Sequence, residues 1–347
     1  MGAGLYLHVP FCRRKCPYCN FYSVPAQPEL LTAYTAAVCR NLRHYGNAAQ
    51  PERVDTVYFG GGTPSLLLPA QIAQVLETAA EQFALSADAE ITLEANPATV
   101  TPEQLRELRH AGINRLSLGV QSLSDVQLKR LGRLHTAQEA VETVYAAAEA
   151  SFRNLSCDLM LALPEQTADE LEQTVSRLVQ PPITHVSAYL LKVEQGTPFA
   201  VQHVAECCPD DDTAADLYLQ AVEQLGAAGF LQYEISNFAK AGFESRHNCK
   251  YWHCEPYLGI GPSAHSCWNG KRFFVPSAVS DFLEQPVQPV ETEDETPCTP
   301  EEKLLLGMRL TEGVPASWLA EKQAAAERYC NLGFLQKVGE RIAFTPK

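Results

Sequence analysis

The sequence has little positive charge and no long hydrophobic run. Its 347 residues include 27 Lys and Arg against 41 Asp and Glu, which gives a formal net charge of −14. A protein that binds duplex nucleic acid by neutralising phosphates carries the opposite sign, so no nucleic-acid partner is expected. No apolar stretch is long enough to span a bilayer, so no integral membrane segment is expected either.

Targeting signals are also absent from the first residues. Residues 1–10 lack the basic segment followed by an apolar segment that marks a signal peptide, and Tyr6 stands where a myristoylation signal requires Ser or Thr. We therefore expect a cytoplasmic protein, and leave open a membrane-associated partner.

Cysteine, by contrast, is abundant and unevenly distributed. Three of the twelve cysteines, Cys12, Cys16 and Cys19, fall within the first 19 residues. In a reducing compartment such clustering indicates metal or redox chemistry rather than disulfides.

Short β-branched or apolar runs alternate with helical patterns along the first half of the chain. The runs cover residues 5–9, 56–59, 91–94, 115–120, 155–163 and 185–191. Four of the intervening helices begin with a capping-box pattern, at Thr101, Ser124, Thr136 and Thr167. Six successive strand–helix units predict an α/β fold with a parallel sheet, closed into a partial (β/α)6 barrel of the TIM type.

The remainder of the chain predicts additional parts around this barrel. We expect the barrel in residues 1–200 and an extension in 201–284, with a helix near 213–226 and a strand near 232–238. Residues 285–300 are rich in Pro, Glu and Thr and are interpreted as a linker. Residues 301–347 are expected to form a small, mainly helical domain that ends in a hairpin.

Polar residues follow the strands at the barrel edge where such folds carry out their chemistry. These residues are Tyr6, the Gly60–Thr63 run, Glu94 and Gln121.

The spacing Cys12-x-x-x-Cys16-x-x-Cys19 is the strongest signal. Three thiolates can hold three irons of a [4Fe–4S] cube and leave the fourth iron open. The alternative is a structural zinc site, which needs a fourth ligand; His8 or Cys39 could supply it.

This motif after a strand, in a chain of βα units, resembles the radical S-adenosylmethionine (SAM) superfamily. The resemblance narrows to the oxygen-independent coproporphyrinogen oxidase-like branch over residues 5–12, 60–65, 93–97, 118–122 and 131–135 and at Asp158. It implies a radical SAM barrel in which the open iron chelates SAM, and the reduced cluster cleaves SAM to a 5′-deoxyadenosyl radical. By the same match, SAM is expected to contact Tyr6, Gly61, Gly62, Thr63, Glu94, Gln121, Arg133 and Asp158.

The segment His247-Asn-x-x-Tyr251-Trp252 is similar to the motif of the HemW-type heme chaperones. That resemblance implies heme as a ligand, His247 as a heme contact, transfer to a heme-accepting protein, and a small winged-helix-like C-terminal domain that looks trimmed here. The coproporphyrinogen oxidases carry a further cysteine where this chain has Phe21. Cys249, Cys254 and Cys267 lie near His247 in sequence and are either inert or part of another metal site.

The expected function is therefore heme binding and delivery, with SAM and the cluster as a gate for transfer. The alternative is an enzyme that decarboxylates coproporphyrinogen III. A third hypothesis is a zinc-stabilised adaptor.

Overall fold

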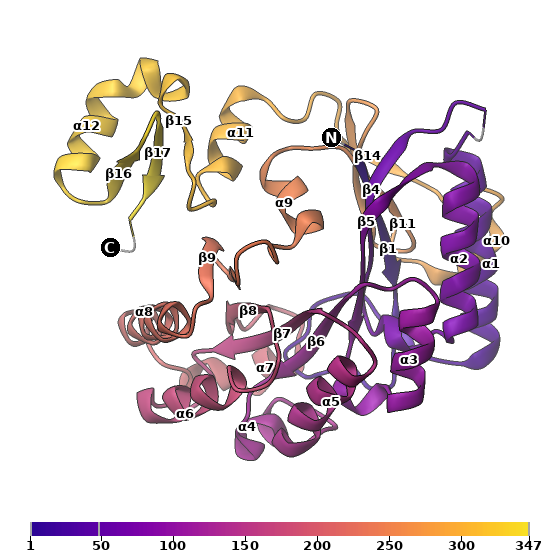
Figure 1. Ribbon diagram of the computed structural model, residues 1–347, viewed down its shortest axis with the longest axis horizontal. Helices are drawn as coiled ribbons and strands as arrows, with labels where there is room; N and C mark the ends of the chain where they lie inside the picture. Colours follow the sequence, from indigo (N-terminus) through magenta and orange to yellow (C-terminus); the bar gives the residue numbers. More distant parts are fainter. Residues whose placement is uncertain (1, 48, 346–347) are drawn as a thin grey trace.

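One large curved sheet runs through the molecule, and most helices pack on its outer face (Figure 1). The computed structural model describes residues 2–47 and 49–345. Met1, Ala48, Pro346 and Lys347, which fall inside the expected domain bounds, lie outside the described residues.

Twelve strands form this sheet in the described part of the chain, in the order β14-β13-β12-β11-β1-β4-β5-β6-β7-β8-β10-β9. Their bounds are β1 Ala3–Val9, β4 Arg53–Gly61, β5 Ala84–Ala95, β6 Arg115–Gln121, β7 Asn154–Leu161, β8 His185–Leu190, β9 Leu231–Glu234, β10 Asn237–Ala239, β11 Tyr257–Ile260, β12 His265–Trp268, β13 Lys271–Phe274 and β14 Glu291–Asp294. In this spatial order, the seven neighbouring strands that begin with β11 and end with β8 pair in parallel. The pairs on either side of them are antiparallel. Because β14 and β9 are the two edges, the barrel stays open, as predicted.

Helices connect the parallel strands and cover the sheet. They are α1 Pro28–Tyr45, α2 Pro69–Gln82, α3 Pro102–His110, α4 Asp125–Arg130, α5 Ala137–Glu149, α6 Ala168–Leu178, α7 Pro198–Val201, α8 Asp211–Ala227, α9 Arg246–Trp252 and α10 Val279–Glu284, with short 3-10 turns at Pro64–Leu66, Pro97–Thr99 and Val204–Cys207. None of the described helices is both long and apolar enough to cross a membrane.

The predicted helix starts are confirmed, with one difference in detail. Thr101 and Thr136 form complete capping boxes. At Ser124 and Thr167 the hydroxyl caps the helix, but the third-position side chains bond to each other: Gln127 Nε2 donates to Glu170 Oε2 at 3.1 Å. A contact between α4 and α6 therefore takes the place of the bond that each third-position side chain would otherwise make to the backbone N–H of its own N-cap residue.

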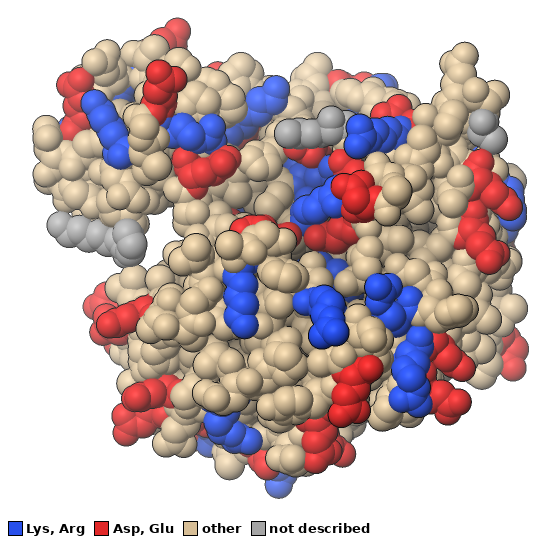
Figure 2. Space-filling model, in the orientation of Figure 1, with Lys and Arg blue, Asp and Glu red and all other residues tan. Residues whose placement is uncertain are grey.

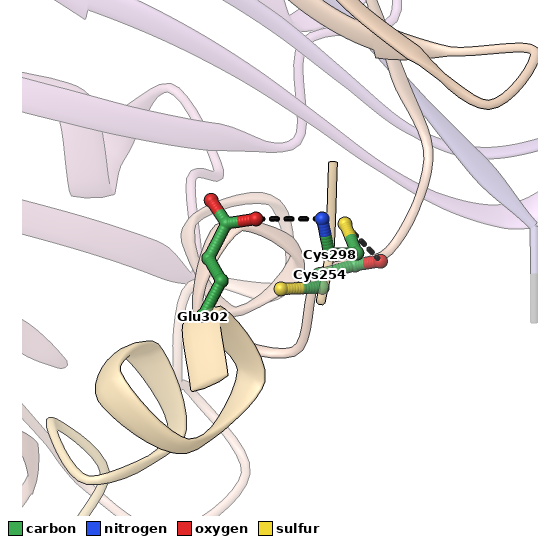
Figure 3. Close-up of side chains that lie close together, drawn as sticks. All are labelled: Cys254, Cys298 and Glu302. Atoms are coloured by element: carbon green, nitrogen blue, oxygen red, sulfur yellow. Dashed lines mark hydrogen bonds between the residues drawn. The ribbon is translucent and has the colours of Figure 1, made fainter. Parts of the chain in front are cut away.

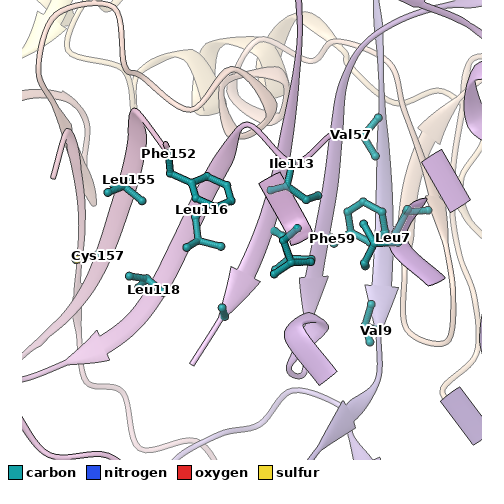
Figure 4. Close-up of a cluster of buried hydrophobic side chains, with 14 of the residues drawn as sticks. Leu7, Val9, Val57, Phe59, Ile113, Leu116, Leu118, Phe152, Leu155 and Cys157 are labelled. Atoms are coloured by element: carbon teal, nitrogen blue, oxygen red, sulfur yellow. The ribbon is translucent and has the colours of Figure 1, made fainter. Parts of the chain in front are cut away.

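The strands alternate between an apolar outer face and a polar inner face. Leu7 and Val9 of β1, Val57 and Phe59 of β4, and Leu116 and Leu118 of β6 all belong to the hydrophobic cluster that joins sheet and helices (Figure 4). The intervening positions carry polar groups. Because side chains in a strand alternate with period two, these polar groups face the interior of the barrel.

Three segments differ from the predicted elements. β11 adds a seventh parallel strand beside β1, in a region without a strand pattern. The strand expected near 232–238 is a hairpin, β9 and β10, because residues 235–236 turn the chain. The expected linker 285–300 contains β14, which pairs with β13. Gln288, in the same segment before β14, is buried and hydrogen-bonded to Asn41 and Gly259.

The C-terminal part forms a lobe on the side of the molecule away from α1 and α2 (Figure 1). It consists of α11 Pro300–Gly307, β15 Val314–Pro315, a 3-10 turn Ala316–Lys322, α12 Gln323–Asn331, β16 Leu335–Val338 and β17 Arg341–Phe344. The expected hairpin is β16–β17, and β15 adds a third strand to it. On the face in Figure 2, acidic and basic side chains are mixed.

Candidate cofactor and ligand sites

A cavity of about 420 Å³ opens at the carboxyl ends of the parallel strands; we call it the barrel cavity. Ten of the twelve predicted site residues line it: Cys12, Cys16, Cys19, Gly61, Gly62, Thr63, Glu94, Gln121, Arg133 and Asp158. Tyr6 and His247 are not among its lining residues.

Strand register explains this convergence. Glu94 of β5 lies beside Ser117 of β6, and Asp158 of β7 lies beside Ser187 of β8. All four side chains therefore occupy inward positions near one end of the sheet. Gln121 ends β6 with a φ of 68°, at a point where the β6–β7 register shifts, and this left-handed turn brings its side chain to the cavity.

The three cysteines occupy a loop that leaves β1. Cys12 ends the short strand β2 (Phe11–Cys12), which pairs with β3 (Val24–Pro25) and closes the loop. Thr63 Oγ1 donates to Cys12 Sγ at 3.6 Å, and Arg133 Nη1 donates to Cys16 Sγ at 3.6 Å. Two predicted SAM residues thus contact two of the predicted cluster cysteines.

The spacing of these sulfurs separates the two metal hypotheses. Among the described residues, three ligand atoms within 4.8 Å of one another occur at Cys254, Cys298 and Glu302, but not at the three loop cysteines. A single zinc ion with Zn–S bonds of about 2.3 Å needs sulfurs roughly 3.8 Å apart. Cys39, one proposed fourth ligand, is buried against the Gln74 carbonyl. The three loop sulfurs are therefore not arranged around a single ion in this structure.

Two carboxyl groups of the barrel cavity have strongly raised pKa values. Glu94 accepts from the Tyr58 hydroxyl at 2.8 Å and from the Gly61 backbone N–H at 3.1 Å. Withdrawal from water, and then the nearby Asp158, raises the pKa of Glu94 to about 7. Burial also raises the pKa of Asp158 to about 6, although Arg115 and Ser117 oppose the shift. Both groups are poised to ionise when a cationic ligand enters.

Two arginines of the cavity have unpaired N–H groups. Arg133 donates to Asn96 and to the Gly119 carbonyl, but its Nε is buried and has no hydrogen-bond partner in the described part of the chain. Arg115 is almost fully buried, and its Nε and Nη1 also lack partners among the described residues. A buried guanidinium with free donors fits an anionic ligand group such as a carboxylate.

Arg115 was missed at the sequence level. It is the first residue of the apolar run 115–120, and a charged residue at that position usually marks the end of a strand rather than a buried site. Its register beside Thr92 and Asn154 places it inside the barrel instead.

The glycine run is required by the protein's own packing. A Cβ at Gly62 would lie 2.7 Å from the Phe11 carbonyl oxygen, and a Cβ at Gly61, where φ is +106°, would lie 2.7 Å from the His8 ring. Both glycines also line the barrel cavity, and their expected contact with SAM stays a prediction.

A second cavity of about 780 Å³, which we call the aromatic cavity, adjoins the first. Phe21, Gly61 and Glu94 line both cavities. The aromatic wall is made by Tyr22, Tyr251, Trp252 and Tyr257, and Tyr6 lies here, hydrogen-bonded to His8 Nδ1 at 3.1 Å. Tyr6 thus lines the aromatic cavity, whereas most of the other residues expected to contact SAM line only the barrel cavity.

His247 is enclosed behind this wall. Its ring is fully buried, Nδ1 bonds to Thr56 Oγ1 at 2.8 Å, and Nε2 bonds to Tyr251 Oη at 3.0 Å. Burial, then the positive charge of Lys250, lowers the pKa of His247 to about 3. Both ring nitrogens are thus engaged, one by Thr56 of β4 and the other by Tyr251 of α9. The expected contact of His247 with heme stays a prediction.

Helix α9 is held in place by charged groups. The backbone N–H groups of Arg246 and His247 donate to the Glu90 carboxylate at 3.1 and 3.0 Å. Lys250 Nζ contacts Asp55 Oδ1 at 2.7 Å and Glu255 Oε2 at 3.0 Å. The helix that carries the aromatic wall is therefore anchored at both ends to the barrel.

Comparison with known proteins places the chain in a family. Residues 6–178 match the model of the Radical SAM superfamily. The chain is 36% identical to the heme chaperone HemW of Mycobacterium tuberculosis, over 99% of this chain and 90% of that protein. It is 44% identical to the mitochondrial radical S-adenosyl methionine domain-containing protein 1 of Mus musculus, over 76% of this chain but only 60% of that protein.

This chain belongs to the HemW family of radical SAM proteins. The solved structure of coproporphyrinogen III oxidase (HemN) from Escherichia coli has the same fold, with a TM-score of 0.83 and 22% identity over 100% of this chain and 87% of that one. The predicted fold class, a partial radical SAM barrel with a small C-terminal domain, is confirmed.

The radical SAM superfamily uses a [4Fe–4S] cluster and SAM, and the barrel cavity of this HemW-family chain fits both. Three cysteines on one loop of the cavity suit a cluster. The unpaired N–H groups of Arg115 and Arg133 suit the SAM carboxylate, and Glu94 and Asp158 suit an ammonium or ribose hydroxyls.

Proposed function

We propose that this chain binds heme in the aromatic cavity and passes it to an acceptor protein. The observation that carries the proposal is the cavity itself. Its described lining contains six Phe, Tyr or Trp side chains and, as the only Lys or Arg, Arg272. Heme is a flat apolar macrocycle with two carboxylates, so aromatic faces and one guanidinium match its two kinds of surface. The mycobacterial relative is itself named a heme chaperone.

We propose that Cys12, Cys16 and Cys19 ligate the cluster and that Gly61, Gly62, Thr63, Glu94, Gln121, Arg133 and Asp158 contact SAM. A bound cluster supplies an open iron for SAM and a source of one electron. In this arrangement Arg133 orients the SAM carboxylate while it bonds to Cys16, and Thr63 orients Cys12. Glu94 accepts from the SAM ammonium or ribose.

His247 then supports the aromatic wall of the aromatic cavity, and Tyr6 lies in the lining of the same cavity. His247 holds the Tyr251 hydroxyl, and Tyr251 packs edge-on against Tyr257 with ring centroids 4.7 Å apart. Arg309 covers Trp252 at 4.3 Å from the ring centroid. The wall is thus fixed before ligand arrives, which lowers the entropic cost of binding.

Delivery is tested by mixing the heme-loaded, cluster-reconstituted chain with an apo-protein that binds heme tightly. We expect transfer from the loaded chain to be faster than dissociation of heme into buffer, and to require the cluster cysteines. Transfer no faster than passive dissociation would contradict a delivery role.

The same preparation tests the oxidase alternative. Supplied with SAM, a reductant and coproporphyrinogen III, the chain should form no protoporphyrinogen IX. Formation of that product would replace the chaperone proposal. The acceptor protein and the cytoplasmic location stay predictions from the sequence.

A further inference from the structure

Three cysteines from distant parts of the chain meet at one end of the aromatic cavity. Cys254 follows α9, Cys267 lies on β12, and Cys298 lies in the loop before α11. Glu302, on the first turn of α11, completes the group, and all four residues line the cavity. We call them the thiol cluster.

The distances among Cys254, Cys298 and Glu302 match a single metal ion, and Cys267 lies beside them. The sulfurs of Cys254 and Cys298 and a carboxylate oxygen of Glu302 all lie within 4.8 Å of one another. The sulfurs of Cys267 and Cys298 are 3.7 Å apart. Thiolates that share a tetrahedral zinc ion, with Zn–S bonds of about 2.3 Å, lie roughly 3.8 Å apart. Cys267 thus contacts one member of the group of three and is the candidate fourth ligand.

Neighbouring groups orient the ligands in advance. Glu302 reaches from α11 toward the two cysteines and accepts from the Cys298 N–H at 2.6 Å (Figure 3). The other Glu302 oxygen pairs with Arg272 at 2.5 Å. Ligands of structural metal sites are typically held by such outer contacts. The cationic Arg272 also offsets part of the negative charge that three thiolates and a carboxylate bring together.

The backbone adopts a costly conformation to achieve this arrangement. Cys254 has a φ of 54° and Cys298 a φ of 65°, the left-handed region that residues with a side chain seldom occupy. The two turns bring their sulfurs together, although 44 residues separate them. A bound ion would offset this cost.

We propose that Cys254, Cys267, Cys298 and Glu302 form a zinc site, separate from the three loop cysteines. Thiolate with one carboxylate is a donor set that suits zinc. Each coordinating thiol releases one proton to solvent, and no oxidant or reductant is needed. The ion joins α9, β12 and α11, so it fixes the end of α9 that carries Tyr251 and Trp252.

Zinc content tests the site in full-length chain that carries Cys12→Ala, Cys16→Ala and Cys19→Ala, so that no cluster contributes metal. The reduced protein is loaded with Zn²⁺, challenged with a chelator, and analysed for bound zinc. We expect one zinc per chain. We expect Cys254→Ser with Cys298→Ser to weaken retention at least tenfold, and Cys207→Ser with Cys330→Ser, outside the cluster, to leave it unchanged.

X-ray absorption of the zinc-loaded triple variant, without the further substitutions, supplies a readout that does not depend on the folding of the double variants. Sulfur neighbours at about 2.3 Å from zinc support the site. Zinc that the chelator removes completely, equal retention in the two double variants, or zinc without sulfur neighbours would overturn it. Hemin is not used, so the result is independent of the proposed heme function.

Discussion

The imidazole of His247 stacks on the ring of Tyr58, with centroids 5.1 Å apart and planes inclined by 29°. The Tyr58 hydroxyl donates to Glu94 at 2.8 Å, and His247 Nε2 bonds to Tyr251 at 3.0 Å. Three successive contacts therefore connect Glu94, which lines both cavities, with Tyr251, which lines the aromatic cavity. Occupation of one cavity can change the free energy of binding in the other through these side chains.

Heme and SAM are expected to influence each other's affinity. Because linkage is reciprocal, SAM should change the hemin Kd by the same factor by which hemin changes the SAM Kd, about fivefold or more. Tyr58→Phe keeps the stack on His247 but removes the bond to Glu94, so it should reduce this factor. The two Kd values are measured by titration with and without the other ligand. Independent binding in the wild type would contradict the connection.

His247 is expected to act through Tyr251. His247 supports the aromatic wall through its hydrogen bond to Tyr251, and both Tyr251→Phe and His247→Ala remove that bond. The two variants should therefore weaken hemin binding to a similar extent, about threefold to thirtyfold, and should leave the ligands of the heme iron unchanged. Hemin titrations and the absorption spectrum of the bound ferric heme measure both effects. A change of ligand spectrum in His247→Ala alone would show that His247 contacts the iron after rearrangement.

Binding of SAM is expected to depend on pH through Glu94. Its pKa of about 7 means that the empty site is protonated below neutrality, and a protonated carboxyl does not pair with an ammonium. SAM affinity should be highest above pH 7 and fall by up to about tenfold per unit below it. Glu94→Gln should flatten this dependence and lower affinity at high pH.

Glu94→Gln should weaken SAM binding at high pH but raise the free energy of unfolding of the ligand-free chain. A carboxyl whose pKa rises from 4.5 to about 7 on folding binds its proton more tightly in the native state, so its contribution to stability falls as pH rises through that range. Above pH 7, Glu94→Gln should therefore raise the free energy of unfolding of the ligand-free chain. Loss of stability at that pH would contradict the origin assigned to the shift.

Lys250 is expected to stabilise the fold. Its side chain is buried, and Nζ contacts Asp55, Glu255 and the Gly2 carbonyl. Lys250→Met leaves Asp55 without its cation, which should cost about 3–5 kcal/mol in urea unfolding. Lys271→Met, which breaks the exposed pair with Glu295, should cost less than about 1 kcal/mol. Equal losses would show that burial does not set the energy of the Lys250 contacts.

The six barrel strands could be predicted because short β-branched and apolar runs mark them locally, and Cys12, Cys16 and Cys19 could be predicted from their spacing. Glu94 and Gln121 end predicted strands, whereas Arg133 and Asp158 were expected to line a site only because the motifs around them resemble those of the radical SAM family. β11 and β14 lack such patterns: β11 is four residues long, and β14 has the composition of a linker but is fixed by pairing with β13.

Other features depend on contacts between distant segments. Cys254 and Cys298 are 44 residues apart, without metal-site spacing, and meet only because α9 and α11 pack together. The bonds of His247 to Thr56 and Tyr251 likewise depend on how α9 docks on β4. No local pattern distinguishes an enclosed histidine from one that faces a cavity.

The most direct test of the account is a hemin titration of the anaerobically reconstituted chain, with Trp252→Ala compared to Trp318→Ala. Trp252 belongs to the aromatic cavity, whereas Trp318 lies half-exposed in the C-terminal lobe outside it. We predict one hemin per chain in the wild type and in Trp318→Ala, and at least tenfold weaker binding in Trp252→Ala. Unchanged binding in Trp252→Ala, or equal loss in both variants, would contradict heme binding in the aromatic cavity.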